Sequence, residues 1–266
     1  MTARLEESTV LITGASGGIG RAIAHALHQR GATVVLTARR VNMLDEIARE
    51  LGDRVEVVGA DLSNRPDIDR LAQRTDVDVL VANAAVPAAG RLQTFSDRAI
   101  QLAIDVNVRA PMQLTLALLP HMLEREAGHL VYVSSLAGKV ASGGSSVYSA
   151  TKFALRGFGY SLSEELRETG VGVTTVYPGF IREAGMFHES GAKLPRGVGT
   201  RTPEDVAKAV VEGIDRNRAE IDVAPFSLSS GAKVFGLSPP MMSRITRMLG
   251  GDGVSEQLEV GQRDKR

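Results

Sequence analysis

The chain contains 266 residues, a length that suits one large α/β domain, and its 43% hydrophobic and 23% charged residues are typical of an ordinary globular protein. Lysine plus arginine equals aspartate plus glutamate at 31 each, and basic residues form no block, which argues against binding of nucleic acid or of a membrane surface. The absence of cysteine excludes disulfides, thiol catalysis and cysteine-ligated metals.

The N-terminal stretch MTARLEESTV contains two glutamates and no apolar segment, so it does not have the pattern of a signal peptide. No uninterrupted apolar run approaches the roughly 20 residues that a membrane span needs. We therefore expect a cytoplasmic protein without a membrane span.

Apolar, β-branched stretches alternate with amphipathic stretches along the chain. The apolar stretches predict strands at 8–13, 32–38, 54–60, 77–85, 128–135, 170–178 and 219–225. The amphipathic stretches predict helices at 19–30, 41–51, 66–74, 97–126, 147–169 and 203–216, the last capped by Thr202. Most strands are apolar throughout, as expected for parallel strands covered on both faces. The pattern predicts a doubly wound α/β domain over residues 1–249, with a seven-stranded parallel sheet flanked by helices, and a polar tail at 250–266.

A glycine-rich turn, TGASGGIG, joins the first predicted strand to the first predicted helix at residues 13–20. Glycine lets the backbone turn tightly and approach a pyrophosphate, and the helix N-terminus offers unpaired N–H groups and a partial positive charge. A strand before the turn and a helix after it favour dinucleotide binding, although any strand–helix junction can use glycine.

The end of the second predicted strand indicates which dinucleotide is bound. An acidic residue there would bond the ribose hydroxyls of NAD, but the sequence has Ala38 followed by Arg39 and Arg40. A small residue leaves room, and a guanidinium can bind a 2′-phosphate through two parallel hydrogen bonds. These residues favour NADP(H) over NAD(H); the alternative is a pair of solvated arginines.

A tyrosine and a lysine stand four residues apart in SSVYSATKFAL, residues 145–155. At this spacing Tyr148 and Lys152 share one helix face. A nearby cation favours the phenolate, so we expect a pKa for Tyr148 below its usual value near 10, which suits a proton donor and acceptor. The alternative is two side chains that only pack on a helix surface.

Taken together, these motifs resemble the classical short-chain dehydrogenase/reductase family over about residues 9–223. The motifs that complete the resemblance are Asp61-Leu62, Asn83-Ala84-Ala85, Asn107 in DVNVRAP, Ser135 thirteen residues before Tyr148, and Pro178-Gly179. The resemblance implies a Rossmann-type domain and an enzyme.

The resemblance also implies roles for individual residues. Tyr148 would be the general acid and base, Lys152 would lower its pKa and bond the nicotinamide ribose, and Ser135 would orient the substrate oxygen. Asn107 would hold a water in a proton relay to Lys152. Ser134 and Ser135 point to opposite sides of a strand, so only one can serve, and the spacing favours Ser135. The implied cofactor contacts are Gly14, Ser16, Gly18, Ile19, Gly20, Arg39, Arg40, Asp61, Leu62, Asn83, Ala84, Ala85, Tyr148, Lys152, Pro178, Gly179 and Ile181.

Two positions depart from the family pattern. Ala85 stands where the family has glycine, which adds a methyl group near the cofactor. Glu183 stands where the family often has a threonine that bonds the nicotinamide carboxamide, so either backbone groups make that contact here or the segment follows a different path.

The resulting expectation is an NADP(H)-dependent carbonyl reductase or alcohol dehydrogenase that acts on CH–OH donors, with a small hydrophobic ketone or secondary alcohol as substrate. The alternatives are a 3-oxoacyl thioester reductase and, from another class, a non-catalytic NADP(H)-binding regulatory protein. The histidines have no convincing ligand partners, so no metal is expected.

Two further expectations concern assembly and motion. Small residues on the predicted helix 147–169, together with the resemblance, predict a homodimer or homotetramer. The stretch 185–200 contains four glycines and the apolar residues Met186, Phe187 and Leu194, which predict a mobile lid over the substrate. Lys193, Arg196 and Arg201 leave room for an acidic group at its rim.

Overall fold

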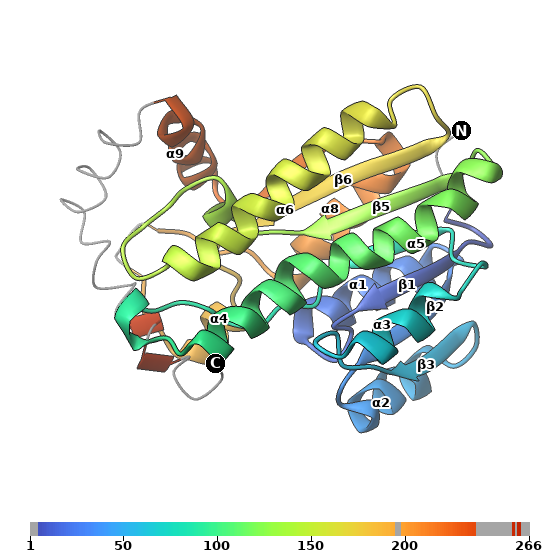
Figure 1. Ribbon diagram of the computed structural model, residues 1–266, viewed down its shortest axis with the longest axis horizontal. Coiled ribbons are helices and arrows are strands. Elements are labelled where there is room, and N and C mark those ends of the chain that lie inside the picture. Colours follow the sequence, from blue (N-terminus) through green and yellow to red (C-terminus); the bar gives the residue numbers. More distant parts are fainter. Residues whose placement is uncertain (1–4, 195–197, 238–256, 259, 262–266) are drawn as a thin grey trace.

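A seven-stranded, fully parallel sheet forms the middle layer of the protein in a computed structural model that describes residues 5–194, 198–237, 257–258 and 260–261 (Figure 1). The strands are β1 (Thr9–Thr13), β2 (Thr33–Ala38), β3 (Val55–Gly59), β4 (Val79–Ala82), β5 (Gly128–Val133), β6 (Val171–Pro178) and β7 (Glu220–Val223). Their order is β3-β2-β1-β4-β5-β6-β7. Strands β1 to β3 are added toward one edge of the sheet and β4 to β7 toward the other, so the strand order switches between β1 and β4. Open α/β sheets bind ligands at such a switch point, beyond the carboxyl ends of the strands.

Helices cover both faces of the sheet. One face carries α1 (Gly18–Gln29), α2 (Val41–Leu51) and α8 (Pro203–Arg216). The other face carries α3 (Arg65–Ala72), α4 (Asp97–Ile104), α5 (Ala110–Glu124) and α6 (Ser146–Glu165). Two further helices, α7 (Gly185–Ser190) and α9 (Phe226–Leu237), follow β6 and β7. The predicted Rossmann-type architecture with seven parallel strands is confirmed.

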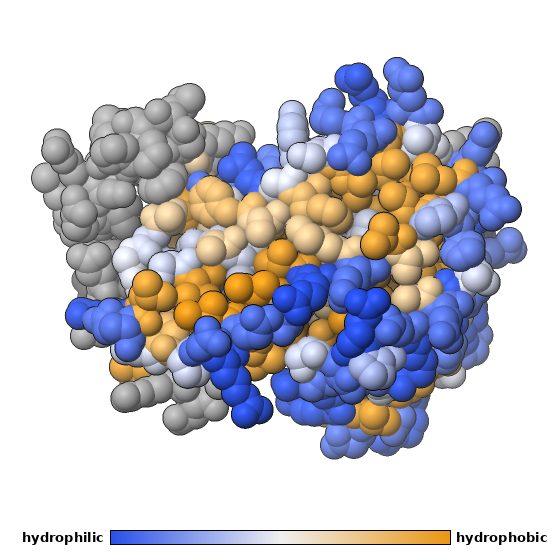
Figure 2. All heavy atoms as spheres, viewed as in Figure 1, coloured by the Kyte–Doolittle hydropathy of each residue, from blue (hydrophilic) through white to orange (hydrophobic). Residues whose placement is uncertain are grey.

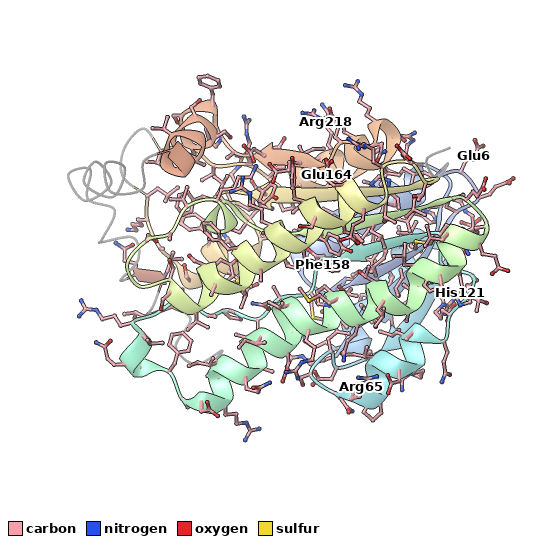
Figure 3. All side chains as sticks on the ribbon, turned by 45° about the horizontal axis from the view of Figure 1, so that its top comes forward. Glu6, Arg65, His121, Phe158, Glu164 and Arg218 are labelled. Carbon is pink, nitrogen blue, oxygen red and sulfur yellow. The ribbon has the colours of Figure 1, made fainter. Side chains whose placement is uncertain are left out.

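The core consists of two hydrophobic layers, one on each face of the sheet. Val10 and Ile12 of β1 enter the layer under α1 and α8, whereas Leu11 between them enters the layer under α5 and α6. In the second layer, Phe158 of α6 lies between its helix and the sheet and meets the ring of Tyr132 edge-on, with 5.4 Å between ring centroids (Figure 3). Burial on both faces explains why the strands are apolar throughout.

Several boundaries differ from the sequence prediction. The predicted helix 97–126 is interrupted by a π-helical turn at Asp105–Arg109, which separates α4 from α5. The predicted helix 147–169 ends at Glu165. Helices α7 and α9 were not predicted. The N-cap prediction is confirmed, because Thr202 Oγ1 accepts a hydrogen bond from the backbone N–H of Asp205.

The combined helical run Asp97–Glu124 is long and apolar enough to cross a membrane, by length and composition only, and it is the one such run in the described residues. Its most apolar window has a mean hydropathy of 1.2 and is 44% buried inside the protein. Ala110, Leu114 and Leu118 of this run belong to the core layer under the sheet. Packing against the sheet therefore accounts for the apolar residues on the inner side of this run.

The outer surface of these helices is also partly apolar. Figure 2 shows hydrophobic side chains gathered across the face that α4, α5 and α6 form. The exposed large hydrophobic residues of these three helices are Ile104, Leu116, Leu123, Phe153 and Tyr160, and Leu116 has 76% of its surface accessible. Large exposed apolar patches are uncommon on monomeric proteins and are often contact surfaces.

Candidate active site

The glycine turn between β1 and α1 leaves no room for side chains at two positions. Gly14 has φ +68°, and a Cβ atom there would lie 2.7 Å from the Cα of Ala84. A Cβ atom on Gly20 would lie 2.3 Å from the carbonyl oxygen of Gly14. Helix α1 begins at Gly18, and no side chain caps it at Gly17. The first N–H groups of a helix have no partner within it, so these donors suit a phosphate.

The end of β4 holds the glycine turn in place. Asn83 donates from Nδ2 to the carbonyl oxygens of Thr13 and Gly14, at 3.0 and 3.2 Å. In return, Thr13 Oγ1 accepts hydrogen bonds from the backbone N–H groups of Asn83 and Ala84, both at 3.0 Å. Asn83 thus supports the glycine turn. The backbone of Ala85 is not in the left-handed region, so its methyl group introduces no backbone strain.

Two exposed arginines follow β2 beside the glycine turn. Arg40 Nη2 lies 3.4 Å from the carbonyl oxygen of Ser16, within the turn. Arg39 lies close enough to Asp61 to act on its charge. Arg40 thus lies beside the glycine turn, and Arg39 lies beside Asp61.

Asp61 and Leu62 follow β3. Burial raises the pKa of Asp61, but the N–H and O–H groups of Ser63 and the charge of Arg39 more than offset this and hold the pKa below its ordinary value. Asp61 Oδ1 accepts the two bonds from Ser63, at 2.9 and 2.7 Å. Leu62 is buried beneath the loop.

The two serines at the end of β5 point in different directions. Ser134 Oγ donates to the backbone carbonyl of Lys152 at 3.0 Å, inside the protein. Ser135 Oγ lies near enough to the phenol of Tyr148 to lower its pKa, and lies 3.4 Å from the carbonyl oxygen of Pro178. The backbone N–H of Ala137 donates to Ser135 Oγ at 3.1 Å and fixes its position. The structure therefore brings Ser135, and not Ser134, to Tyr148.

Tyr148 and Lys152 lie on the first turns of α6. The Nζ atom of Lys152 is 5.7 Å from the centre of the Tyr148 ring and donates to the backbone carbonyl of Val133 at 3.1 Å. Burial lowers the pKa of Lys152 to about 8. Burial raises the pKa of Tyr148 to about 12, against the opposing effect of the Ser135 hydroxyl. The predicted lowering of the Tyr148 pKa is wrong for the protein alone, because desolvation of the phenolate outweighs other effects.

Asn107 lies at the centre of the π-helical turn and is fully buried. Its Oδ1 accepts from the backbone N–H of Val86 at 2.8 Å, and its Nδ2 donates to the carbonyl oxygen of Val86 at 3.1 Å and to Thr151 Oγ1 at 3.4 Å. Both amide hydrogens thus go to protein groups, so a relay water would bond elsewhere on this residue. π-Helical turns are frequent at functional sites.

The segment after β6 lies against the glycine turn. Gly179 donates its N–H to the carbonyl of Val223 at 3.0 Å, and Ile181 is buried and bridges to Arg201. A Cβ atom on Gly18 would meet the Cβ of Ala184 at 2.4 Å, and one on Gly185 would meet Ile19 at 3.2 Å.

Glu183, where the family often has threonine, is exposed and has φ +71°. Its Oε1 accepts from Arg182 Nε at 3.0 Å. The carboxylate of Glu183 is therefore paired with an arginine. Glu183 does not provide the hydroxyl group with which threonine would bond the nicotinamide carboxamide.

The predicted lid contains a short helix. Helix α7 holds Met186 and Phe187, and the ring of Phe187 lies 5.0 Å from that of Phe180. Residues 195–197, which include Arg196, are outside the described residues. Gln257 of the predicted tail accepts from the backbone N–H of Lys193 at 2.7 Å, so the described part of the tail contacts this segment.

Sequence reasoning missed Thr13 and Thr151, the hydroxyl partners of Asn83 and Asn107. Thr13 is the first residue of the glycine motif and ends a predicted strand, so its role could have been predicted. The role of Thr151 could not, because its partner Asn107 is 44 residues away in the sequence. No group of three or more histidine, aspartate or glutamate residues that could hold a metal occurs within the described parts of the chain.

Comparison with known proteins agrees with this geometry. The short-chain dehydrogenase family matches residues 8–195. The chain belongs to the short-chain dehydrogenase/reductase family. It is 34% identical over 259 residues to the ketoacyl reductase HetN of Nostoc sp., a match that covers 92% of this chain and 90% of the relative.

Solved structures of the family show the same fold with cofactor. The closed form of serine dehydrogenase complexed with NADP+ superposes with a TM-score of 0.75 at 31% identity, over 82% of this chain and 95% of that chain. A short-chain dehydrogenase from Sphingobium yanoikuyae in complex with NADPH superposes with a TM-score of 0.77 at 28% identity, over 89% and 95%.

The chain is therefore an oxidoreductase of the short-chain dehydrogenase/reductase family, and its residues fit a nicotinamide cofactor. The observation that supports the fit is the cradle at Gly14 and Gly20, which any Cβ atom would fill, beside the uncapped start of α1. Such a cofactor supplies or accepts the hydride.

Proposed function

We propose that the protein is an NADP(H)-dependent carbonyl reductase or alcohol dehydrogenase, acting between nicotinamide and a hydrophobic ketone or secondary alcohol. The observation that carries the proposal is the placement of Ser135 beside the Tyr148 phenol, with Lys152 Nζ 5.7 Å from the centre of the Tyr148 ring. The three side chains meet beyond the carboxyl end of β5, on the same edge of the sheet as the glycine turn.

The protonation states of these groups suit the reduction of a carbonyl. With a pKa raised to about 12 by burial, Tyr148 keeps its proton at neutral pH and can donate it to a carbonyl oxygen. Ser135 can donate a hydrogen bond to the same oxygen, where negative charge develops. Lys152, with a pKa of about 8, is mostly charged at neutral pH and has protons left for the ribose hydroxyls after its bond to Val133.

The preference for NADP(H) rests on Arg39 and Arg40. Both are exposed at the end of β2, and Ala38 before them leaves space for a 2′-phosphate. The two structural relatives that contain NADP+ and NADPH support this choice.

A 3-oxoacyl thioester reductase is the second candidate. It is favoured by the similarity to the ketoacyl reductase HetN, which matches nearly the whole chain.

We also propose that the protein is cytoplasmic and forms a homo-oligomer. The sequence pattern supports the location, and the apolar face over α4, α5 and α6 supports the oligomer (Figure 2).

Replacement of Tyr148 by phenylalanine tests the proposal. Turnover would be followed by NADPH absorbance on a panel of ketones, 3-oxoacyl thioesters and secondary alcohols. We expect Tyr148→Phe to lower kcat by about 10²–10⁴-fold, because the proton donor is lost, with NADPH binding retained. The matched control is Tyr160→Phe, which removes an exposed phenol from the same helix.

Each outcome has a distinct meaning. Near-parental turnover in a folded Tyr148→Phe variant would show that another group supplies the proton. Binding of NADPH by the parent without turnover of any member of the panel would favour the non-catalytic regulatory protein. A preference for thioesters over ketones would favour the second candidate.

A further inference from the structure

A cluster of charged side chains lies just behind Ser135. The side chain of Lys139 is only 10% exposed, and its Nζ donates to Glu220 Oε2 at 3.0 Å and to Asp222 Oδ1 at 2.8 Å. The same Nζ lies 3.8 Å from the centre of the Tyr177 ring. Burial of an unpaired ammonium group is costly, and here two carboxylates and an aromatic face surround it.

Glu220 connects Lys139 to two further elements. Its Oε1 accepts from the Tyr177 phenol at 2.5 Å and from Arg156 Nε at 3.3 Å. Burial raises the pKa of Glu220, but the bonds from Tyr177 and Lys139 and the charge of Arg156 more than offset it, so the pKa is lowered and the carboxylate stays ionised. Two cations and two carboxylates therefore balance, and Glu220 uses both of its oxygens.

Each partner of Glu220 lies within four residues of a residue of the proposed active site in the sequence. Lys139 ends the 3₁₀ turn that follows Ser135. Arg156 is one helical turn after Lys152 on α6, and Tyr177 directly precedes Pro178, whose carbonyl oxygen faces Ser135 Oγ. The cluster thus joins three elements that carry site residues to the edge strand β7.

The 3₁₀ turn that follows Ser135 spans only Leu136–Gly138. Its backbone bonds run from Gly138 to Ser135 and from Lys139 to Leu136, both at 2.8 Å, and Ala137 donates to Ser135 Oγ. The ion pairs of Lys139 attach the far end of this turn to β7. A shift of the turn would move Ser135 Oγ away from the Tyr148 phenol.

We propose that Lys139 is a positioning residue, whose ion pairs with Glu220 and Asp222 hold the turn after β5 so that Ser135 faces Tyr148. Lys139 does not touch the reacting atoms and acts through Ser135. This inference rests on the proposed function, because it assigns Lys139 a part in the same reaction.

A double-mutant cycle with Ser135→Ala tests whether Lys139 affects turnover through Ser135. Displacement of a catalytic group by about 1 Å can cost about 10²-fold, so we expect Lys139→Met to lower kcat by about 10–100-fold, with the Kd for NADPH within about twofold of the parent. In the Ser135→Ala background, the same substitution should have almost no further effect, since the group that it positions is gone. An equal loss in both backgrounds, or parental kcat in folded Lys139→Met, overturns the proposal.

Two further variants keep the test decisive. If Lys139→Met does not fold, Asp222→Asn replaces it in the cycle, because it removes one carboxylate charge, keeps the shape and leaves the pair with Glu220. The control is Arg30→Met, which breaks an ion pair with Asp215 at 2.7 Å between α1 and α8, away from the site. It should leave kcat unchanged in either background.

Hydrogen exchange separates this inference from the proposed function. In Lys139→Met or Asp222→Asn, we expect the amides of residues 137–139 to exchange at least about tenfold faster than in the parent, with β5 itself unchanged. A parent that turns over no substrate refutes the proposed function, and the exchange result then still decides whether Lys139 holds the turn. Parental exchange rates at 137–139 refute the inference.

Discussion

Replacement of Lys152 by methionine should separate stability from activity. Lys152 is only 2% exposed, and burial lowers its pKa from 10.5 to about 8. At 1.36 kcal/mol for each pKa unit, this difference means that the charged side chain destabilises the folded protein at neutral pH by about 3 kcal/mol. Methionine has a similar length and no charge. It leaves the carbonyl of Val133 without its donor, which costs about 1–3 kcal/mol.

We therefore expect Lys152→Met to be as stable as the parent or more stable by up to about 2 kcal/mol at pH 7, measured by urea unfolding. Its kcat should fall by about 10²-fold or more, because the cation beside Tyr148 is gone. Lys208→Met, which changes an exposed lysine on α8, is the control for both measurements.

The dependence on pH gives the sharper test. The folded pKa of Lys152 lies below the unfolded pKa, so between about pH 8 and 10.5 the unfolded chain binds more protons and the contribution of Lys152 to stability rises with pH. The stability of the parent relative to Lys152→Met should rise by about 3 kcal/mol across this window, whatever the loss at Val133 costs. A difference that stays constant with pH would refute the assignment of a buried, charged lysine.

Three other predictions concern the cofactor, the assembly and the lid. NADPH should bind more tightly than NADH in fluorescence titrations, and Arg39→Ala should reduce that preference; equal affinities in the parent contradict it. Light scattering should show a dimer or tetramer that Leu116→Lys weakens by placing a charge on the apolar face, whereas a 28 kDa parent monomer at working concentration contradicts it. Hydrogen exchange of residues 185–194 should slow when NADPH and product bind, and unchanged exchange together with parental kinetics of Met186→Ala and Phe187→Ala would show that the segment is only a connection.

The sheet and most helices could be predicted because their signals are local. Strands with both faces buried need apolar residues at every position, and helix α8 has its proline and its capping threonine in adjacent positions. The π-helical turn at Asp105–Arg109 could not be predicted, because the apolar pattern runs through it without a break. The bonds of Asn107 to Val86, 21 residues away, accompany the extra residue of this turn.

In the candidate site, too, some features could be predicted from the sequence and others could not. Tyr148, Lys152 and the glycine turn have fixed spacings, and these could be read from the sequence. The pKa of Tyr148 could not, because sequence shows the neighbouring charge but not the desolvation that outweighs it. The Lys139 cluster could not be predicted for a related reason. Glu220 is 81 residues from Lys139, and only the pairing of β6 with β7, which places Glu220 opposite Thr175 and Asp222 opposite Tyr177, brings the carboxylates to Lys139 and Tyr177.

Lys139 and Lys152 show how one protein can bury two lysines for different purposes. Lys139 has two carboxylate partners and an aromatic ring, so its charge is neutralised within the chain. For Lys152, the described residues provide one backbone carbonyl and no ion pair, and its pKa falls accordingly. The ammonium group of Lys152 has N–H donors beyond its bond to Val133, and a ligand that accepts hydrogen bonds from them would stabilise its charge. The destabilisation at Lys152 is therefore the expected cost of a site prepared for its cofactor, and cofactor binding should raise the stability of the parent more than that of Lys152→Met.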